Sequence, residues 1–511
     1  MLLSSSGRIA EIDQYAESKL GISAITLMGR AAEAVSNVIR ERLKKGGSVV
    51  ILAGKGNNGG DGYAAAFLLN KDYKVTVIDV FSSGQRSDAG KHWMSLADDA
   101  GVPILPLDFS DSQRSLIDSA DCIVDAIFGT GYSGEYPECL ISLSKIVKDA
   151  PALKVAVDVP LGVSADLGTV YSDVAYRQNV TVTLSFIKPG LVSYPGKEYV
   201  GKLIFDNLNL PLDILRSEFA FLDYLIDFDL ATSLMPKRAE NTNKGSFGKL
   251  LVCCGSGEYR GAPRLSLESA LRSGAGFISF LGSETLADSL LPDFPEVIYH
   301  TATDSDLPER LHKLSLSHTA TLIGSGSGKR ECLRLALREM LSHDGCPVIL
   351  DADALNLIAE EGDSGIDLLR LSPRKIVITP HPLEMARLLN TTVEFVQNNR
   401  ISVARDFAQQ TGAVLVLKGA ATLVTDGREV YVNSSGSSAL AKAGSGDVLA
   451  AVIASLVASG MLPLSASALA VYVHGAAADT LAEEFSKLGV TPSDLPQEIA
   501  RQLRKLEKSS E

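Results

Sequence analysis

A glycine-rich turn near the start of the chain carries an unusual set of polar side chains. Its sequence, GKGNNGGDG at residues 54–62, follows an apolar run and fits the spacing GxGxxG, with Asp79 about 20 residues further on. Such glycines let backbone N–H groups approach an anion at the start of a helix, as in dinucleotide-binding turns. However, Asn57, Asn58 and Asp61 fill this turn with amide and carboxylate oxygens. These atoms suit a hard cation or a polarised substrate better than a bare pyrophosphate.

Two acidic residues follow other apolar runs of the same half. Asp125 opens the segment DAIFGTG, and Asp158 opens the segment DVPLG. Taken singly, each is as well explained as a helix cap or a turn former. Open α/β sheets bind ligands outside the carboxyl ends of their strands. The two aspartates and the glycine-rich turn together therefore indicate one shared binding edge.

A second glycine-rich turn, GSGD at residues 444–447, precedes the apolar segment 448–457. Free N–H groups and the positive end of the helix dipole at such a turn can stabilise a phosphoryl group during transfer. A carboxylate at the same place can accept the proton of an attacking hydroxyl, so Asp447 is a candidate general base. The alternative is an N-cap aspartate after glycines that only turn the chain.

Three further segments are compatible with phosphoryl transfer. The loop Lys418–Thr422 follows an apolar run, so it is expected to meet a nucleotide phosphate. Asp351 and Asp353 end another run and are candidates for holding Mg²⁺ through water, although they could equally be turn residues. His381 lies between two prolines in an extended loop, and a lone histidine of this kind is more often structural than functional.

These loops require a scaffold of parallel strands. Apolar runs alternate with polar loops and helical patterns in both halves, which predicts an α/β fold with mainly parallel sheets covered on both faces. A helix is predicted at Tyr63–Leu69, directly after the first glycine-rich turn. The predicted strands are 49–53, 75–80, 122–126, 155–159 and 180–184, followed by 250–254, 277–281, 320–323, 348–350, 376–379, 414–417 and 422–425.

The chain of 511 residues is long enough for two large α/β domains. Residues 206–243 show no regular pattern and contain two prolines and a charged run. We therefore predict one domain over residues 1–218 and a second over residues 219–511.

Composition excludes several classes of protein. The chain has 48 Lys and Arg against 61 Asp and Glu, a net charge of −13, whereas general nucleic-acid binding needs a basic face. None of the six cysteines forms a CxxC pair, which argues against a zinc ribbon or a thioredoxin-type redox site. Cys253 and Cys254 are adjacent in an apolar run and are interpreted as buried strand residues in a reducing compartment.

One uncharged segment, Val448–Val473, exceeds the roughly 18 residues that raise the question of a membrane span. Gly460 and Pro463 interrupt it, and it is rich in Ala and Ser. We therefore predict two buried helices joined by a turn near these two residues. The N-terminal residues lack the apolar core of a signal peptide, so a cytoplasmic protein that does not bind membranes is expected.

The first half resembles the YjeF N-terminal domain, the NAD(P)HX epimerase family, through GISAITLMGRA, GKGNNGGDG, VDAIFGTG and DVPLGVSADLG. The resemblance implies a Rossmann-like parallel sheet, a K⁺ ion bound by Asn58 and Asp125, and proton transfer at the hydrated ring by Asp158. The further substrate contacts that it implies are Asn57, Asn58, Gly59, Gly60, Asp61, Gly129, Thr130, Gly131, Tyr132, Ser133, Gly134 and Glu135. The family usually has a serine that helps to hold K⁺ where this chain has Leu161, so only the Leu161 carbonyl could serve.

The second half resembles the ribokinase-like fold, and more narrowly the ADP-dependent NAD(P)HX dehydratase family. The similar segments are NKGSFGKLLVCCGS, GAPRLSLESALRSGAG, IGSGSG, TPHPLEMARLL and AKAGSGDVLA. The resemblance implies an α/β sandwich with Asp447 as the base. The substrate contacts that it implies are Ala262, Gly324, His381 and Asp447, and the nucleotide contacts are Lys418, Gly419, Ala420, Ala421, Thr422 and Gly446. Asn243 and Ala451 depart from the His and Gly that are usual in this family.

Together the two resemblances imply repair of hydrated nicotinamide cofactors. The first domain would interconvert R- and S-NAD(P)HX, and the second would dehydrate the S form while converting ADP to AMP and phosphate. ADP, Mg²⁺ and K⁺ are the expected cofactors, NADHX or NADPHX the expected substrate, and a homo-oligomer, a homotetramer or larger, the expected assembly. The first alternative is an ATP-dependent vitamin or sugar kinase with an N-terminal nucleotide-binding scaffold domain, which GSGD favours equally. The others are a non-enzymatic scaffold, whose first half binds a nucleotide as a signal, and a redox dehydrogenase.

Overall fold

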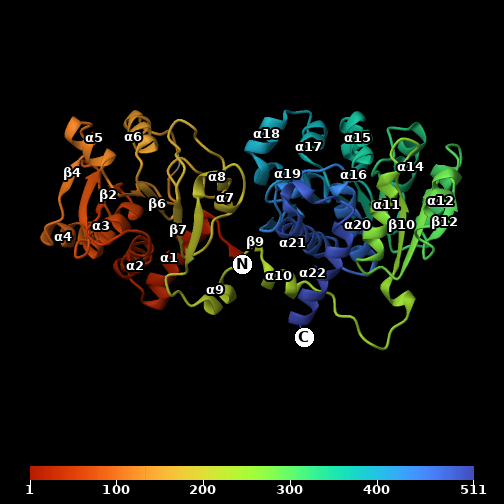
Figure 1. The fold of residues 1–511 in the computed structure, drawn as a ribbon, viewed down its shortest axis with the longest axis horizontal. Helices are drawn as coiled ribbons and strands as arrows, with labels where there is room; N and C mark the ends of the chain where they lie inside the picture. Colours follow the sequence, from red (N-terminus) through yellow and green to blue (C-terminus); the bar gives the residue numbers. More distant parts are fainter. Residues whose placement is uncertain (133, 511) are drawn as a thin grey trace. The chain divides into compact units, whose positions relative to one another are not determined.

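The computed structural model describes residues 1–132 and 134–510 (Figure 1). It divides into two compact units. One consists of Leu2–Asp223, and the other consists of Met1 and the chain from Tyr224 onward. The boundary predicted from the sequence, after residue 218, lies a few residues before this division.

The first unit is built on a seven-stranded sheet with the order β4-β3-β2-β5-β6-β7-β8. All neighbouring strands in it are parallel. Its strands are β2 (Ser48–Ala53), β3 (Lys74–Asp79), β4 (Ile104–Pro106), β5 (Cys122–Ala126), β6 (Leu153–Val157), β7 (Val180–Leu184) and β8 (Lys202–Asp206), and a short strand, β1 (Leu2–Leu3), precedes them. The helices are α1 (Ser6–Leu20), α2 (Ala24–Arg42), α3 (Asn57–Leu69), α4 (Asp88–Asp99), α5 (Asp111–Asp118), α6 (Glu138–Asp149), α7 (Pro189–Val192), α8 (Lys197–Val200) and α9 (Leu212–Glu218).

Strand β2 shows how this sheet is buried on both faces. Ile51 packs in a cluster with residues of α2 and α3, whereas its neighbour Leu52 packs in a second cluster with residues of α6. Because successive side chains of a strand point to opposite faces, a strand buried on both sides is apolar throughout. The predicted parallel, doubly covered sheet is confirmed.

The second unit contains a larger sheet, in which the strands from β9 onward have the order β9-β18-β17-β16-β15-β14-β13-β10-β11-β12. The stretch β16-β15-β14-β13-β10-β11-β12 is parallel throughout, whereas β17 pairs antiparallel with both β16 and β18. The strands are β9 (Asp223–Ile226), β10 (Lys249–Cys253), β11 (Phe277–Gly282), β12 (Ile298–Thr301), β13 (Ala320–Ile323), β14 (Val348–Leu350), β15 (Ile376–Ile378), β16 (Val414–Leu417), β17 (Leu423–Thr425) and β18 (Val430–Asn433).

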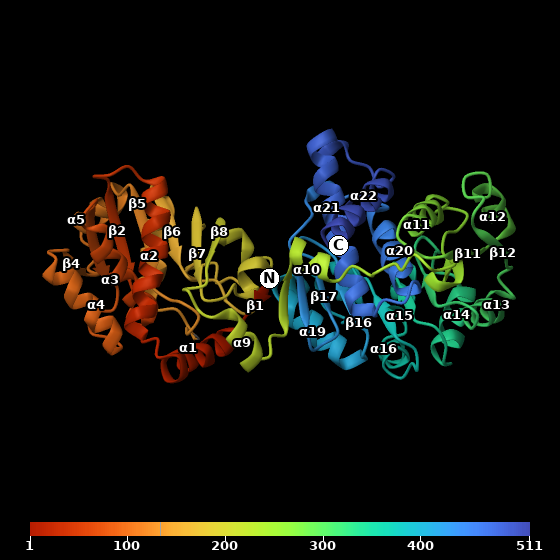
Figure 2. The ribbon, with the colours of Figure 1, turned by 90° about the horizontal axis from the view of Figure 1, so that it is seen from below.

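Helices surround this sheet, and the two predicted apolar helices are present as α20 and α21 (Figure 2). Helix α20 ends at Ala458 and helix α21 begins at Pro463, so the predicted turn between them is also confirmed. No helix among the described residues has the length and apolar character needed to span a membrane. The helices are α10 (Phe228–Ser233), α11 (Gly261–Leu271), α12 (Glu284–Leu290), α13 (Leu307–Ser315), α14 (Glu331–Leu341), α15 (Asp353–Glu360), α16 (Asp363–Arg370), α17 (Pro382–Leu388), α18 (Val393–Asn398), α19 (Arg400–Thr411), α20 (Ser445–Ala458), α21 (Pro463–Gly489) and α22 (Leu495–Ser510), with 3₁₀ turns η1 (Lys244–Phe247) and η2 (Ser438–Leu440).

Two expectations about local structure were wrong. Residues 206–243 are not irregular throughout, because they contain α9, β9 and α10. Helix α3 begins at Asn57 rather than at Tyr63, so the polar residues of the first glycine-rich turn lie in its first turns. Glycines disfavour helix in isolation. Here they are required by packing, since a Cβ on Gly59 would lie 1.9 Å from the carbonyl oxygen of Gly54.

Candidate active sites

The three polar loops of the first unit meet at one edge of its sheet. Strands β2, β5 and β6 are neighbours, and Gly54, Asp125 and Asp158 lie at or just after their carboxyl ends. The turn after β2 packs directly on the loop after β5, because a Cβ on Gly54 would lie 1.8 Å from the carbonyl oxygen of Ile127. The sequence therefore brings these residues to a common binding edge, as expected for an open α/β sheet.

The Asn58 side chain at this edge has no hydrogen bond to any described residue. It is buried, and neither its amide nitrogen nor its amide oxygen has a partner. It lies beside Gly129, on which a Cβ would come within 3.4 Å of the Asn58 oxygen. Buried amides are almost always hydrogen-bonded, so Asn58 has the features expected of a residue that binds a ligand or an ion.

Asp158 is held in a strained backbone conformation next to a buried lysine. Its φ of +67° is in the left-handed region, which is uncommon for non-glycine residues and is concentrated at functional sites. Its Oδ1 accepts hydrogen bonds from the Lys188 ammonium and from the Leu184 N–H at 3.1 Å. Lys188 also donates to the Leu184 carbonyl at 2.7 Å and to Thr183 Oγ1 at 3.2 Å.

Two further carboxyl groups interact electrostatically with this pair. Burial, followed by the charges of Asp158 and Asp13, raises the pKa of Asp61 well above its usual value. Burial also raises the pKa of Asp13 to about 6, with Lys188 opposing the rise. Perturbed acids around one lysine are typical of a proton-transfer site.

Asp125 is buried and well supplied with hydrogen-bond donors. Its Oδ2 accepts from the Leu161 N–H at 2.9 Å and from Gln178 Nε2 at 3.2 Å, and its Oδ1 accepts from the Ile127 N–H at 3.4 Å. Burial nevertheless raises its pKa to about 6. The Leu161 side chain packs into a hydrophobic cluster of the sheet, so only backbone atoms of this residue can serve an ion.

Tyr132 of the predicted substrate loop 129–135 stacks on Phe128, the residue that precedes the loop. Phe128 and Tyr132 are parallel, with ring centroids 3.8 Å apart, and the Tyr132 hydroxyl donates to the Glu135 carbonyl at 2.5 Å. The predicted contact Ser133 lies outside the described residues. The remaining predicted contacts are Gly129, Thr130, Gly131 and Gly134, which all lie in the loop after β5.

In the second unit, the predicted residues follow five strands that are neighbours in the sheet. The order β16-β15-β14-β13-β10 places their carboxyl ends side by side. The residues that follow these strands are Lys418, His381, Asp351, Gly324 and, in the first turn of α11, Ala262. Gly324 has a φ of +116°, and a Cβ there would lie 2.0 Å from the Asp351 carbonyl oxygen. Close backbone packing therefore accounts for the glycine.

Lys418 lies at the centre of this edge. Its ammonium is 2.8 Å from Asp351 Oδ1 and 3.8 Å from Glu384 Oε2, and a Cβ on Gly446 would lie 3.3 Å from it. Burial alone would lower the pKa of Lys418, but these two carboxyl groups raise it overall. The lysine is thus a cation next to the start of α20, where a phosphate is predicted.

Asp447 occupies the third position of α20 and is half-buried. The N-cap is Gly444, with a φ of +96° and no side-chain cap, so the alternative of an N-cap aspartate is wrong. No hydrogen bond joins the Asp447 carboxyl group to another described residue. Burial and the nearby Asp351 raise its pKa to about 7. A free carboxyl with this pKa has the properties of a general base.

His381 combines a structural role with exposure to the site. Its Nδ1 accepts hydrogen bonds from the N–H groups of Leu383 and Glu384, both at 3.2 Å, so the residue caps α17. Nδ1 is therefore unprotonated, and Nε2 carries the hydrogen in the neutral ring. Burial, followed by Lys418, lowers the pKa of His381, which leaves a neutral ring beside the site.

The predicted Mg²⁺ residues already have protein partners. Asp351 accepts hydrogen bonds from Thr379 Oγ1 at 2.7 Å and from Ser325 Oγ at 2.9 Å, besides its pair with Lys418. Asp353 accepts from the Gly328 N–H at 2.8 Å. A cavity of about 190 Å³ lies beside the loop that contains Gly328, and Ser327 and Arg330 form part of its wall.

Comparison with protein families assigns both halves. Residues 24–190 match the family described as YjeF-related protein N-terminus, and residues 250–501 match the family described as NAD(P)H-hydrate dehydratase. The bifunctional NAD(P)H-hydrate repair enzyme of Coxiella burnetii is 34% identical over 490 residues, 96% of each chain. That of Moorella thermoacetica is 33% identical over 536 residues, 100% of this chain and 98% of the relative. That of Escherichia coli is 33% identical over 493 residues, 94% of this chain and 90% of the relative.

The chain belongs to the bifunctional NAD(P)H-hydrate repair enzyme family. This membership favours cofactor repair over the vitamin kinase and the redox dehydrogenase. The chain is also similar to the ADP/ATP-dependent NAD(P)H-hydrate dehydratase of Bacillus subtilis, co-crystallised with ATP/Mg²⁺, with 29% identity and a TM-score of 0.51 over 56% of this chain and 99% of that one. A ribokinase-like superfamily protein of Enterococcus faecalis, 24% identical with a TM-score of 0.50, covers 56% of this chain and 98% of its own. The expected ribokinase-like fold is confirmed.

Sequence reasoning missed three charged residues of this repair enzyme's candidate sites. Lys188 and Asp13 lie far from the glycine-rich turn in sequence, and Glu384 was read only as part of the segment TPHPLEMARLL. The available signal was Lys188 in the apolar segment SFIKPG, a few residues after the strand 180–184, because a lysine among apolar residues is rarely buried without a partner.

Proposed function

We propose that the second unit phosphorylates the ring hydroxyl of S-NAD(P)HX with ADP. Asp447 would take the hydroxyl proton while the oxygen attacks the β-phosphorus of ADP and AMP leaves. The phosphate would then depart with the electron pair of its bond to the ring, and loss of a proton from the adjacent ring carbon would form the double bond of NAD(P)H. The observation that carries this proposal is the free Asp447 carboxyl, with a pKa of about 7, at the uncapped start of α20. A base with a pKa near the operating pH is the most effective one.

The nucleotide would lie on the loop Lys418–Thr422 and on Gly446. Lys418 reaches the start of α20, where the free N–H groups and the helix dipole favour phosphate oxygens. The Bacillus subtilis relative, co-crystallised with ATP/Mg²⁺, supports a nucleotide at this edge. Since Asp351 and Asp353 are engaged with protein donors, Mg²⁺ would arrive on the phosphates, as it commonly does.

The first unit would interconvert the R and S epimers with Asp158 and Lys188. Among the described residues the carboxylate accepts hydrogen bonds through Oδ1 only, which leaves Oδ2 available to a ring carbon or hydroxyl. Lys188 holds the carboxylate in place, and its positive charge compensates the negative charge that Asp158 carries once it has given up a proton. Asn57–Asp61 and the loop 129–135 would bind the substrate around this pair.

The same edge provides oxygen atoms suited to K⁺. Asn58 offers an unpartnered amide oxygen, and Asp125 offers a buried carboxyl group. When bound, the ion would supply a fixed positive charge for the substrate's phosphates. Leu161 can contribute only its carbonyl, so we propose weak K⁺ binding here.

We also propose a cytoplasmic homo-oligomer, a tetramer or larger. The six cysteines are free, which fits a reducing compartment. Light scattering coupled to size-exclusion chromatography tests the assembly.

One assay tests the two activities together. The full chain is incubated with a mixture of R- and S-NADHX, ADP and Mg²⁺, and NADH absorbance is followed to completion. Conversion of the whole mixture supports both activities, whereas a stop after the S form is consumed contradicts the epimerase. Parallel reactions with ATP, and with pyridoxal and ATP, test for the kinase alternative. Phosphorylation of pyridoxal without conversion of NADHX would overturn the proposal.

A further inference from the structure

Arg400 is a buried cation with no carboxylate partner among the described residues. It is the first residue of α19 and is 1% exposed. Its guanidinium donates to the carbonyl oxygens of Leu417 at 3.2 Å and Lys418 at 3.4 Å, and to Gln397 Oε1 at 2.9 Å. Burial lowers its pKa to about 10, so it keeps its charge at neutral pH.

The guanidinium lies directly against the predicted nucleotide loop. A Cβ on Gly419 would come within 3.1 Å of Arg400 Nη1, and Gly419 has a φ of +131°. Two of the three acceptors of Arg400 are carbonyls at the start of this loop. The arginine therefore fixes the backbone on which a phosphate would lie.

The charges around Lys418 show why a second cation is useful there. Lys418 faces the carboxyl groups of Asp351 and Glu384, so its own charge is largely compensated before any phosphate arrives. A buried charge without a partner is costly to the fold and is expected to persist where it serves an anion. Arg400 provides the positive potential that the Lys418 cluster lacks.

We propose that Arg400 is a positioning residue for the nucleotide, which holds the Lys418–Thr422 loop and attracts the phosphates through its uncompensated charge. The inference rests on the proposed nucleotide site. It predicts an effect mainly on the affinity for the nucleotide, because Arg400 lies beneath the loop and not at the reacting atoms.

The chain offers a matched control in Arg374. It is also buried, at 5% exposure, and donates to the carbonyl oxygens of His343 at 2.8 Å and Asp344 at 3.1 Å. However, Arg374 precedes β15 and so lies at the amino end of a strand, opposite the edge that carries the site. Loss of Arg374 should affect stability without affecting the nucleotide.

The experiment compares Arg400→Met, Arg400→Lys and Arg374→Met in the full chain. ADP binding is measured by calorimetry, and KM for ADP and kcat are measured with S-NADHX. We expect Arg400→Met to weaken ADP binding and raise KM by about tenfold or more, with a smaller change in kcat. Arg400→Lys should restore part of the affinity, and Arg374→Met should lower only the melting temperature.

Equal ADP affinity in Arg400→Met and the parent chain would overturn the inference. So would an equal loss of affinity in Arg374→Met, since the effect would then be general destabilisation. If Arg400→Met does not fold, the ADP affinity of Arg400→Lys decides between the two roles. A purely structural role predicts that Arg400→Lys has a lower melting temperature but an unchanged affinity for ADP. Calorimetry needs no turnover, so failure of the proposed reaction is distinguishable from failure of this inference.

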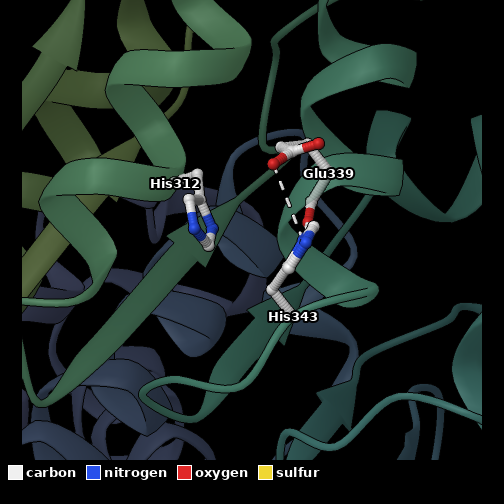
Figure 3. Close-up of side chains that lie close together, drawn as sticks. All are labelled: His312, Glu339 and His343. Atoms are coloured by element: carbon white, nitrogen blue, oxygen red, sulfur yellow. Dashed lines mark hydrogen bonds and ion pairs between the residues drawn. The ribbon is translucent and has the colours of Figure 1, made fainter.

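A different observation concerns a cluster between α13 and α14. Figure 3 shows His312, Glu339 and His343 converging there, and one ligand atom of each lies within 4.8 Å of the others. His343 Nδ1 is 3.6 Å from Glu339 Oε1, and the two imidazole centroids are 5.1 Å apart. His312 Nδ1 is buried and has no hydrogen-bond partner.

We infer that these three side chains bind a divalent transition-metal ion such as Zn²⁺. Two imidazoles and one carboxylate, with further positions left for water, form a common ligand set for zinc. The metal would give the buried nitrogen of His312 a partner. Because it would bind the folded chain, it would also stabilise the folded state, by an amount that grows with the logarithm of the metal concentration. Its position at α13 and α14 is separate from the residues assigned to catalysis.

The test titrates Zn²⁺ into the full chain and into His312→Gln, His343→Gln and, as a control, His92→Gln, which alters an exposed histidine of α4. We expect one Zn²⁺ site to be lost in the first two variants and kept in the control. Co²⁺ should give a visible spectrum without thiolate-to-metal charge transfer, because no cysteine belongs to the cluster. The site would be overturned if both variants bound as many Zn²⁺ ions as the parent chain. It would also be overturned if Co²⁺ gave a thiolate-to-metal charge-transfer band that persisted in both variants.

Discussion

The Lys188 ammonium donates a hydrogen bond to Oδ1 of Asp158, and the two residues follow neighbouring strands of the first sheet. The Lys188 side chain is 1% exposed and that of Asp158 is 13% exposed. An ion pair this deeply buried is costly unless both partners are satisfied, and one oxygen of Asp158 has no donor in the part of the chain that the structure describes. The pair is therefore better suited to proton transfer than to stability alone.

We predict that Asp158→Asn and Lys188→Met each abolish epimerase activity in the full chain. Asn keeps the shape of the side chain but removes the proton acceptor, and Met keeps the length of the lysine but removes its charge. General acid–base catalysis contributes about 10²–10⁴-fold, so consumption of R-NADHX should fall by at least that factor. The measurement is the rate of NADH formation from purified R-NADHX with ADP in excess.

Dehydration of purified S-NADHX serves as the control, because it depends on the other unit. Both variants should repair the S form at the parental rate. Parental consumption of R-NADHX by Asp158→Asn would leave Asp158 as a turn residue with a left-handed backbone.

We predict that Asp447→Asn slows the chemical step of dehydration by about 10²–10⁴-fold, with ADP binding little changed. The parental rate should rise as the pH increases through about 7, because the base must lose its proton and its pKa is about 7. Single-turnover NADH formation from S-NADHX with saturating ADP measures this step. A variant that keeps more than about a tenth of the rate would place the base elsewhere.

Strand prediction succeeded where the strands are fully buried. The runs 122–126, 180–184, 320–323, 348–350 and 414–417 match β5, β7, β13, β14 and β16 residue for residue, because continuous apolar runs between polar loops have few other interpretations. The missed strands include β4 and β12 at the two sheet edges, whose side chains are largely exposed or half-buried. Exposed edge strands give no such pattern.

The candidate sites were predictable as far as loops at strand ends are concerned. Gly54, Asp125 and Asp158 lie at the carboxyl ends of neighbouring strands. This is where open α/β sheets are expected to bind their ligands. What the sequence does not encode locally is which charged residues from other segments reach these loops. Lys188 meets Asp158, and Arg400 meets Gly419, only once the strands are ordered in the sheet.

We predict that Leu161→Ser strengthens the K⁺ dependence of epimerisation. Leu161 lies next to Asp125, to which its N–H donates at 2.9 Å, so a hydroxyl there would add an oxygen beside the proposed ion. The activation constant for K⁺ should fall, while the melting temperature should also fall because an apolar side chain is lost from a buried cluster. Epimerase rates at increasing K⁺, at constant ionic strength, measure the effect. Identical K⁺ curves for the two proteins would contradict it, and Leu161→Ala controls for the lost packing.

We predict that Asp447→Asn, although slower in dehydration, is more stable than the parent chain at alkaline pH. Burial raises the folded-state pKa of Asp447 to about 7 from a usual 3.8, so the folded chain holds this proton more tightly than the unfolded chain. The associated stability is fully present below pH 3.8 and is lost as the pH rises through about 7. Asparagine is neutral at every pH and avoids this loss. The melting temperature of the variant minus that of the parent should therefore increase between about pH 4 and about pH 7 and then level off. A difference that stays constant with pH would mean that Asp447 ionises as an ordinary carboxyl group, and that its free position at the start of α20 has no energetic cost.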